Sequence, residues 1–240
     1  MYTLNYNDRQ IEYEIIRRKR KTIGITITLE CKVIVSAPKN VSKEYIERLI
    51  LRKANWIHQK LDILERTKSE VKEKGFVDGE NLFFMGKSYI IKIRDIDGNV
   101  IKIELSSDRF EIYVGVEIKQ EVRKQIIRES LEKWYRQKAK EVLAERTQYY
   151  SKIMKLYPNR ICIKEQKTLW GSCSSKNNIN YNWKLIMAPI EVLDYVVAHE
   201  LAHMKHMNHS KDFWNYVEVY IPNWKERRNW LKANGNKLKL

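Results

Sequence analysis

The 240-residue chain has only three cysteines, Cys31, Cys162 and Cys173, and no two of them form a CxxC pair. This sparse, odd number argues against a disulfide framework and a cysteine-based zinc knuckle, and it fits a reducing compartment. The sequence also lacks an apolar run of about 18 residues, so we expect no transmembrane helix. Its N-terminus lacks the basic and apolar segments of a signal peptide. We therefore expect a cytoplasmic protein.

Acidic side chains are in the minority, with 30 Asp and Glu against 46 Lys and Arg, and the net charge is +16. The densest basic run is Arg17 to Lys21. Such a balance attracts nucleic acid or another polyanion, but it also occurs in proteins that simply have a lysine-rich surface. We favour the second interpretation, because a basic run by itself is a weak motif. Nucleic acid bound through the basic surface stays open as an additional partner.

Hydrophobic periodicity predicts strands and helices in alternation, and therefore an α+β protein. Residues 1–37 and 81–114 alternate apolar and polar side chains, as strands do, and Asp97-Gly98 is typical of a hairpin turn. Between these regions, residues 42–70 have the spacing of one helix, and the polar segment 68–75 reads as a linker. No internal repeat is apparent.

The second half of the chain predicts a long helix and then a hairpin. Residues 118–150 contain no Gly or Pro and have an amphipathic pattern. Residues 169–173 and 179–185 read as strands on either side of a polar turn, and a further helix follows them. We expect a β-rich N-terminal region with one helix over residues 1–115. Residues 116–240 are then expected to form a second domain, in which a helix packs against a small sheet.

Four of the five histidines lie within residues 199–209, a segment that begins with the pattern H-E-x-x-H. Positions i and i+4 share one face of a helix, so His199 and His203 can both direct an imidazole nitrogen to one zinc ion. Glu200 lies to the side of this pair, where it can take a proton from water held by the metal. The pattern predicts a zinc-dependent hydrolase. Surface histidines on an amphipathic helix are the alternative.

The third ligand is open to three interpretations. His206 shares the helix face of His199 but lies about 10.5 Å further along the axis, which makes convergence difficult. His209 can return to the metal if the helix ends near residue 207 or 208, since asparagine tolerates the left-handed turn that ends a helix. Glu218 on a later helix is the remaining candidate. We favour His209 as the third ligand.

The residues around this motif resemble those of the YgjP-like, SprT-related family of zinc metallopeptidases. The resemblance rests on the segments His199–His203, Met207–Ser210, Phe213-Trp214, Trp170–Ser175, Asn178–Leu185 and Ala188-Pro189. It implies a zincin-like C-terminal domain, Zn²⁺ as cofactor and a peptide or protein substrate. It also implies His199, His203 and His209 as zinc ligands and Glu200 as the catalytic base. This chain departs from the family pattern at Leu169, where the family usually has Arg.

The predicted hairpin suggests how substrate is bound. Zincin-type sites add an extended peptide to a sheet edge, and Trp170, Gly171 and Ser172 are candidates for that edge. The alternative makes Trp170 a core aromatic and Gly171 a bulge. Tyr216 and Tyr220 are downstream candidates for stabilising an oxyanion.

Two further functions compete with a simple peptidase. One is a protease that acts on substrates bound to DNA, which the SprT relationship and the basic charge suggest. The other is a zinc-stabilised module that binds protein or nucleic acid without turnover. A structural zinc site is closed by four protein ligands, whereas a catalytic site leaves one position for water. A fourth ligand such as His206 would therefore favour the binding module.

Overall fold

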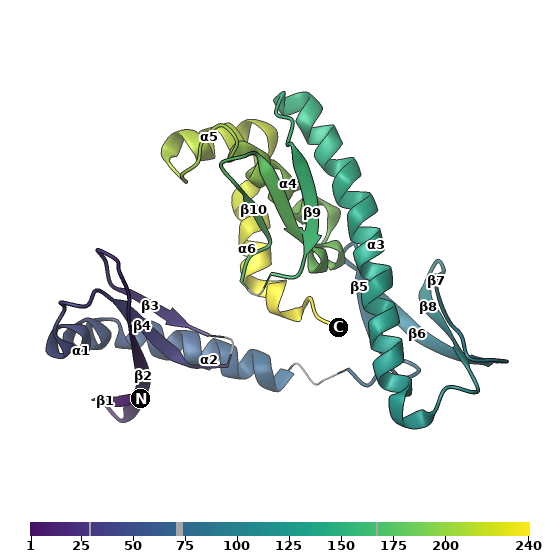
Figure 1. Cartoon of the computed structure of the whole chain (residues 1–240), viewed down its shortest axis with the longest axis horizontal. Helices are drawn as coiled ribbons and strands as arrows, with labels where there is room; N and C mark the ends of the chain where they lie inside the picture. The colour runs from purple at the N-terminus through teal and green to yellow at the C-terminus, as the bar shows by residue number, and fades with distance from the viewer. Residues whose placement is uncertain (29, 71–73, 167) are drawn as a thin grey trace. The chain divides into compact units, whose positions relative to one another are not determined.

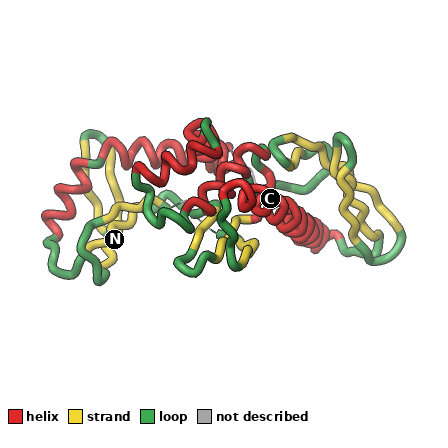
Figure 2. The backbone as a smooth tube through the Cα atoms, turned by 90° about the horizontal axis from the view of Figure 1, so that it is seen from above, coloured by secondary structure: helices red, strands yellow, loops and turns green. Residues whose placement is uncertain are grey.

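The structure is a computed structural model that describes residues 1–28, 30–70, 74–166 and 168–240. Six α-helices and three small sheets lie within these ranges, which confirms a mixed α+β architecture (Figure 2). The chain divides into two compact units, Met1–Glu73 and Lys74–Leu240. In the part of the chain that is described, no helix has the length and apolar content needed to span a bilayer.

The N-terminal unit is a four-stranded sheet with two helices. Its elements are β1 Tyr2–Tyr6, β2 Arg9–Arg17, β3 Gly24–Ile27, β4 Val33–Ala37, α1 Lys43–Arg52 and α2 Ala54–Glu70 (Figure 1). The strand order is β1-β2-β4-β3, in which β2 and β4 are parallel and the outer pairs are antiparallel. Ile11 and Val35 of the sheet pack against Ile46 and Ile50 of α1, and all four are completely buried. The alternating apolar residues of the strands and the helically spaced apolar residues that follow them together form this core.

Two helices form where the sequence predicts a single one. Ser42 caps α1 by accepting a hydrogen bond from the backbone N–H of Tyr45, as expected of a serine before a helix. The helix ends at Arg52, Lys53 is its C-cap, and α2 starts at Ala54. Ile50 and Ala54 on either side of this break are both buried. No Pro or Gly marks this break, so the periodicity does not reveal it. Helix α2 continues to Glu70, and residues 71–73 of the predicted linker lie outside the described residues.

The second unit begins with a sheet of the same topology, a repeat that the sequence does not reveal. Its strands are β5 Asn81–Phe84, β6 Lys87–Ile96, β7 Ile101–Leu105 and β8 Arg109–Gly115, in the order β5-β6-β8-β7. The hairpin predicted at Asp97-Gly98 is wrong, because β6 pairs in parallel with β8 and β7 pairs only with β8 among the described strands. The side chains of Phe110, Ile112 and Val114 are completely buried, which suits β8 to the central position.

The predicted long helix is confirmed as α3, Gln120–Met154. Its buried residues recur every four positions, as in Ile127, Leu131 and Tyr135, and they join one hydrophobic core that also contains Phe110 and Leu201. Figure 1 shows α3 running beside both the β5–β8 sheet and the C-terminal elements. The sheet therefore packs with the residues that follow it. For this reason the contacts divide the chain after Glu73 rather than at the expected boundary between residues 115 and 116.

The remaining elements surround a three-stranded sheet. They are β9 Arg160–Lys164, β10 Gly171–Cys173, β11 Asn178–Asn182, the 3₁₀ helix η1 Trp183–Met187, α4 Ile190–Ala202, α5 Lys211–Tyr220, α6 Trp224–Asn234 and the 3₁₀ helix η2 Gly235–Lys237. The expected hairpin is confirmed as β10 and β11, and β9 pairs in parallel with β11. Residues 183–185 were expected to extend the second strand. They turn into η1 instead, because the side chain of Asn182 accepts a hydrogen bond from the backbone N–H of Lys184.

The turn between β5 and β6 fixes the start of α4. The backbone N–H groups of Met85 and Gly86 donate to the carbonyls of Ile186 (2.8 Å) and Met187 (3.1 Å) at the end of η1. Gly86 has a φ of +77°, and a Cβ atom there would stand 2.8 Å from the Cα of Pro189. Only glycine fits this position, because both the backbone conformation and the close approach disfavour a side chain. The first sheet of this unit is thereby tied to the helix that carries the histidines.

Candidate metal centre

Helix α4 carries the H-E-x-x-H motif. Leu193, Val197 and Leu201 are completely buried and anchor one face of the helix in the core. The return of His209 to the metal was expected if the helix ended near residue 207 or 208. The helix ends earlier, at Ala202, and His203 caps it with helical backbone angles of φ −64° and ψ −21°. The spacing of one turn between the two histidines of the motif is still preserved.

The chain then turns back and brings His209 to the motif. Its Nε2 atom lies 3.1 Å from Nε2 of His199. The ring centroid of His203 is 4.8 Å from that of His199 and 4.7 Å from that of His209. One nitrogen from each of the three rings lies within 4.8 Å of the other two, so the three histidines form one cluster. Neither His206 nor Glu218 belongs to this cluster among the described residues.

The backbone after the motif sets the protonation of one ring. Nδ1 of His203 lies 3.2 Å from the carbonyl oxygen of His206, and a carbonyl only accepts, so Nδ1 carries the proton. The lone pair of His203 is then on Nε2. Phe213 on α5 packs against all three histidine rings, with centroid distances of 4.9 Å to His199, 4.6 Å to His203 and 4.9 Å to His209. This fully buried ring restrains the orientation of the three imidazoles.

All three imidazoles are held in the neutral form at neutral pH. The pKa of His199 is lowered to about 3, first by burial and then by the neighbouring His203 and His209. Burial also lowers the pKa of His203, against the effect of its hydrogen bond to the His206 carbonyl. The pKa of His209 is lowered by burial and then by the charge of Arg228. A neutral imidazole has the free lone pair that metal coordination requires.

This donor set fits zinc. Three imidazole nitrogens that bind one tetrahedral zinc ion at about 2.0–2.1 Å would be about 3.3–3.4 Å from one another. The 3.1 Å separation of the His199 and His209 Nε2 atoms is close to that spacing. Three neutral nitrogen donors are typical of a catalytic zinc site, in which one coordination position remains for a non-protein ligand.

Glu200 lies beside the cluster in an apolar environment. Its side chain is almost completely buried, and this burial raises the pKa of its carboxyl group to about 8. Gly171 of β10 lies directly against it, and a Cβ atom on Gly171 would stand 2.6 Å from both Cγ and Oε1 of Glu200. Glycine at this position therefore allows the small sheet to approach the motif helix. The predicted packing of the H-E-x-x-H helix against a small sheet is observed.

A pocket of about 380 Å³ lies beside the cluster. Its lining consists of Tyr195, His199, His209, Trp214 and Arg228. Three of these residues, Tyr195, Trp214 and Arg228, were not predicted from the sequence as part of the site. Tyr195 lies one helical turn before His199, so the spacing of α4 could have revealed it. Trp214 comes from α5 and belongs to a segment of the family resemblance, whereas no local sequence pattern links Arg228 of α6 to the motif.

The other candidates from the sequence lie in different surroundings. Trp170 is half-buried and packs against Gly235, whose hypothetical Cβ atom would stand 2.7 Å from Cζ2 of the indole. The hydroxyl of Ser172 accepts hydrogen bonds from the side chains of Gln166 and Asn180. These contacts restrain Trp170 and Ser172 of the predicted substrate-binding edge.

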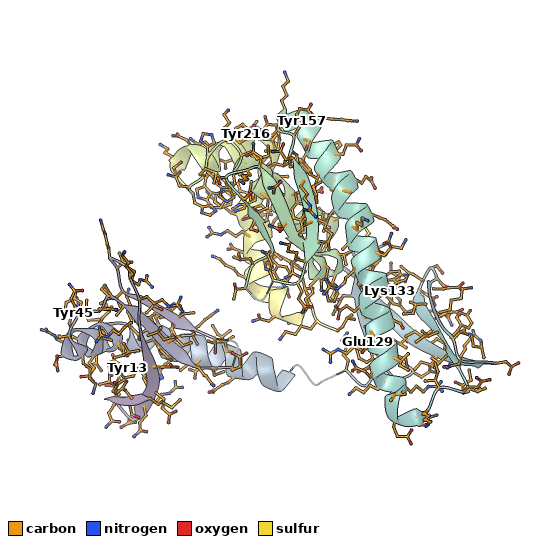
Figure 3. The ribbon with its side chains drawn as sticks, in the orientation of Figure 1. Tyr13, Tyr45, Glu129, Lys133, Tyr157 and Tyr216 are labelled. Carbon is orange, nitrogen blue, oxygen red and sulfur yellow. The ribbon has the colours of Figure 1, made fainter. Side chains whose placement is uncertain are left out.

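The two tyrosines proposed as oxyanion stabilisers do not line the pocket. The Tyr216 hydroxyl, labelled in Figure 3, donates a hydrogen bond to the carbonyl of Met154 at the end of α3. Tyr220 packs against Tyr216, with ring centroids 5.3 Å apart. Their role in stabilising an oxyanion stays a prediction, and the tyrosine that lines the pocket is Tyr195.

The fold and the site together define a mixed α+β protein with a three-histidine cluster, consistent with a metal site, in its C-terminal helical part. The sequence profile of the YgjP-like metallopeptidase domain matches residues 21–234, and the chain belongs to this family. This match confirms the resemblance seen around the motif, and it suggests a peptidase that acts on proteins or peptides.

The solved structures include a partial match. The crystal structure of the metallopeptidase zymogen of Pyrococcus abyssi abylysin is 26% identical, covering 38% of this chain and 93% of that chain with a TM-score of 0.35. No curated protein matches the chain.

Proposed function

We propose that this chain is a zinc-dependent metallopeptidase in which His199, His203 and His209 hold the metal and Glu200 is the general base. The observation that carries the proposal is the convergence of three neutral imidazoles beside a buried carboxyl group. When bound, zinc supplies a Lewis acid that polarises a peptide carbonyl and lowers the pKa of a water molecule to about 7.

Glu200 moves the proton in this proposal. Its carboxylate takes a proton from the attacking water and returns it to the amine nitrogen of the leaving product, while the C–N bond of the peptide breaks. Burial raises the pKa of Glu200 to about 8 in the metal-free chain. A nearby zinc ion would lower this pKa, so that the carboxylate form is available at neutral pH and can act in both steps. Because Gly171 has no side chain, the Glu200 carboxylate keeps its place against β10.

Strand β10 offers an edge for substrate. Among the strands that the structure describes, it pairs only with β11. The Trp170 carbonyl and the Ser174 N–H form hydrogen bonds with the β11 side, so by antiparallel alternation the backbone groups of Gly171 face the free edge. An extended peptide added here as a strand would have its backbone beside Glu200. The substrate-binding role of residues 170–172 is part of this proposal.

The donor set favours a peptidase over a binding module closed by four ligands. The cluster contains three histidines, with no fourth His, Cys, Asp or Glu donor among the described residues. The carbonyl of His206 accepts a hydrogen bond from the ring of His203. The ring of His206 itself packs against Tyr216, at a centroid distance of 5.7 Å. His206 is thus occupied elsewhere, which supports a metal with an open coordination position.

The test compares Glu200→Gln with Glu191→Gln, which changes an exposed carboxylate on the same helix. We expect one zinc per chain in both variants and in the wild type. Hydrolysis of a casein or peptide-library substrate should fall by about 10²–10⁴-fold in Glu200→Gln only. Full activity in Glu200→Gln, or wild-type protein that binds no zinc, would contradict the proposal.

A protease that associates with DNA is the second candidate. Its support is the basic run at residues 17–21, whose side chains are all exposed. Arg17 donates to the carbonyls of Pro38 and Val41, whereas the side chains of Lys19 and Lys21 form no hydrogen bond or ion pair with described residues. Binding to single-stranded and duplex DNA should weaken steeply as salt rises and weaken further when Lys19 and Lys21 become Gln. The absence of binding at low salt would rule this candidate out.

A further inference from the structure

Arg228 on α6 lines the pocket beside the histidine cluster and has no counter-ion there. Its side chain is exposed and forms no hydrogen bond or ion pair with any residue that the structure describes. Its neighbour Arg227 differs, because it donates to the carbonyl of Glu191 at 2.7 Å and so ties α6 to α4. Of the described residues that line the pocket, only Arg228 carries a permanent positive charge. All five of its N–H donors are therefore available to a ligand.

The aromatic residues next to Arg228 restrain its side chain and leave its N–H donors free. Its guanidinium carbon lies 5.1 Å from the ring centroid of Trp214. Trp214 in turn stacks on Trp224, with ring centroids 4.0 Å apart and planes inclined by 15°. When a guanidinium lies over a fixed indole, its charge and its planar set of N–H donors are held in one position. The stack thus holds a cation beside the cluster while leaving its polar edge free.

The guanidinium and the histidines share one electrostatic environment. After burial, the charge of Arg228 is among the causes that lower the pKa of both His199 and His209. Tyr195 lines the same pocket, and burial raises its pKa to about 12, so its hydroxyl remains a neutral donor at neutral pH. The pocket thus presents two kinds of donor next to the proposed metal. Its volume of about 380 Å³ lies in the range of about 300–1,000 Å³ typical of small-ligand sites, which suits the end of a peptide.

We propose that Arg228 is a specificity-determining residue that pairs with a carboxylate of the peptide substrate close to the scissile bond. A planar guanidinium matches a carboxylate through two parallel N–H···O bonds, and no other side chain that lines the pocket offers this recognition. The carboxylate is the α-carboxylate at the C-terminus of the peptide or the side chain of an Asp or Glu residue. The inference rests on the proposed function, since the substrate is taken to be a peptide.

The test measures binding, so that it does not depend on turnover. Three versions of one short peptide are titrated by calorimetry into zinc-supplemented Glu200→Gln protein, in which the peptides stay intact. The first has a free C-terminal carboxylate, the second is its C-terminal amide, and the third is the amide with one Glu near its end. We expect the free acid, the Glu-containing amide or both to bind at least about 10-fold more tightly than the plain amide.

Three substitutions in the same background assign this preference to Arg228. Arg228→Gln should abolish it, and Arg228→Lys should keep only part of it, because a lysine retains the charge without the fork. Lys225→Gln is the matched control, because Lys225 is an exposed cation on the same helix, 5.5 Å from the Trp224 ring, and does not line the pocket. It should keep the full preference.

Two results would overturn the inference: no carboxylate preference in the protein with Arg228, or an unchanged preference in Arg228→Gln. Comparing the free-acid peptide with the Glu-containing peptide shows whether Arg228 recognises an α-carboxylate or a side-chain carboxylate. Activity of the otherwise wild-type protein separates this inference from the proposed function. A preference that depends on Arg228 without zinc-dependent hydrolysis supports the carboxylate site and contradicts the peptidase. Hydrolysis without that preference supports the peptidase and contradicts the site.

Discussion

Gly171 of β10 lies so close to Glu200 of α4 that a Cβ atom on Gly171 would stand 2.6 Å from the carboxylate oxygen Oε1. No side chain, not even that of alanine, fits between the strand and the carboxylate. The small sheet and the H-E-x-x-H helix therefore meet at the group that the proposed function makes the general base. This contact explains why a glycine begins the strand whose edge the proposed function assigns to the substrate.

The contact predicts that Gly171→Ala impairs hydrolysis. The methyl group displaces the Glu200 carboxylate, and a displacement of about 1 Å in a catalytic group lowers the rate by about 100-fold. Zinc content should stay at the wild-type level, because the three histidines are not moved. The measurement is kcat/KM together with metal analysis.

Gly75→Ala serves as the control for this substitution. A Cβ atom on Gly75 would make only ordinary contacts, the nearest at 3.5 Å from Val77. It should leave the activity at the wild-type level. Wild-type activity in Gly171→Ala as well would show that the carboxylate does not depend on the close approach of β10.

The packing of Phe213 predicts a joint loss of stability and metal affinity. The ring is completely buried and touches the imidazoles of His199, His203 and His209. Phe213→Ala should lower the free energy of unfolding by about 3–5 kcal/mol, as in other buried Phe-to-Ala changes. Zinc affinity should weaken by about 10-fold, because the rings lose a neighbour that orients them. Denaturant unfolding and competitive zinc titration measure the two effects.

Val219→Ala provides the comparison for Phe213. Val219 lies on the same helix, and 71% of its surface is exposed. Its replacement should change the free energy of unfolding by no more than about 0.5 kcal/mol. Equal losses in the two variants would mean that Phe213 contributes nothing beyond its place in the helix.

An ion pair between α3 and α4 is expected to stabilise the second unit. The guanidinium of Arg146 donates to both carboxylate oxygens of Asp194, at 2.7 and 2.8 Å, and the side chains are 23% and 11% exposed. Asp194→Asn leaves the arginine without its counter-ion and should cost about 3 kcal/mol of unfolding free energy. Lys138→Gln, which removes an exposed ion pair with Glu141 on α3, should cost less than about 1 kcal/mol. Similar costs for the two variants would contradict a stabilising role for the buried pair.

The buried Glu200 predicts how the stability of the metal-free protein depends on pH. Burial raises its pKa from an ordinary value of 4.5 to about 8, so the folded chain binds this proton more tightly than the unfolded chain. The contribution of Glu200 is therefore fully present below about pH 4.5 and is lost as the pH rises through about 8. The Glu200→Gln variant lacks this contribution at every pH, because glutamine has no ionisable proton.

Thermal unfolding in the presence of a chelator tests this dependence. The melting temperature of Glu200→Gln minus that of the wild type should increase between pH 5 and pH 9, by a few degrees. A constant difference across this interval would mean that the Glu200 carboxyl is not buried in the metal-free protein.

The sequence revealed the parts of the site that are local. The spacing of His199 and His203 follows from helical geometry, and the short segment after the motif favoured His209 as their partner. The convergence of the three rings agrees with that reasoning, although the helix ends at Ala202 rather than near residue 207 or 208. The earlier end of the helix does not change the spacing of His199 and His203, because His203 keeps helical backbone angles as the C-cap.

The parts that depend on contacts between distant segments were not predictable from one sequence. Trp214 and Arg228 reach the pocket because α5 and α6 pack back onto α4, and no motif encodes that packing. The β6–β8 pairing was missed for a related reason. A good turn signal at Asp97-Gly98 predicted a local hairpin, whereas the buried face of β8 takes the central place in the sheet. Long-range burial overrides a local turn preference here.

The proposed site has three imidazoles that share one zinc ion, and no further side chain closes it. X-ray absorption at the zinc edge, with metal analysis of the same sample, measures this directly. We expect one zinc per chain, bound to three histidine nitrogens at about 2.0–2.1 Å, with no sulfur and no fourth protein donor. A chain that takes up no zinc, or a spectrum that requires four protein donors, would contradict it.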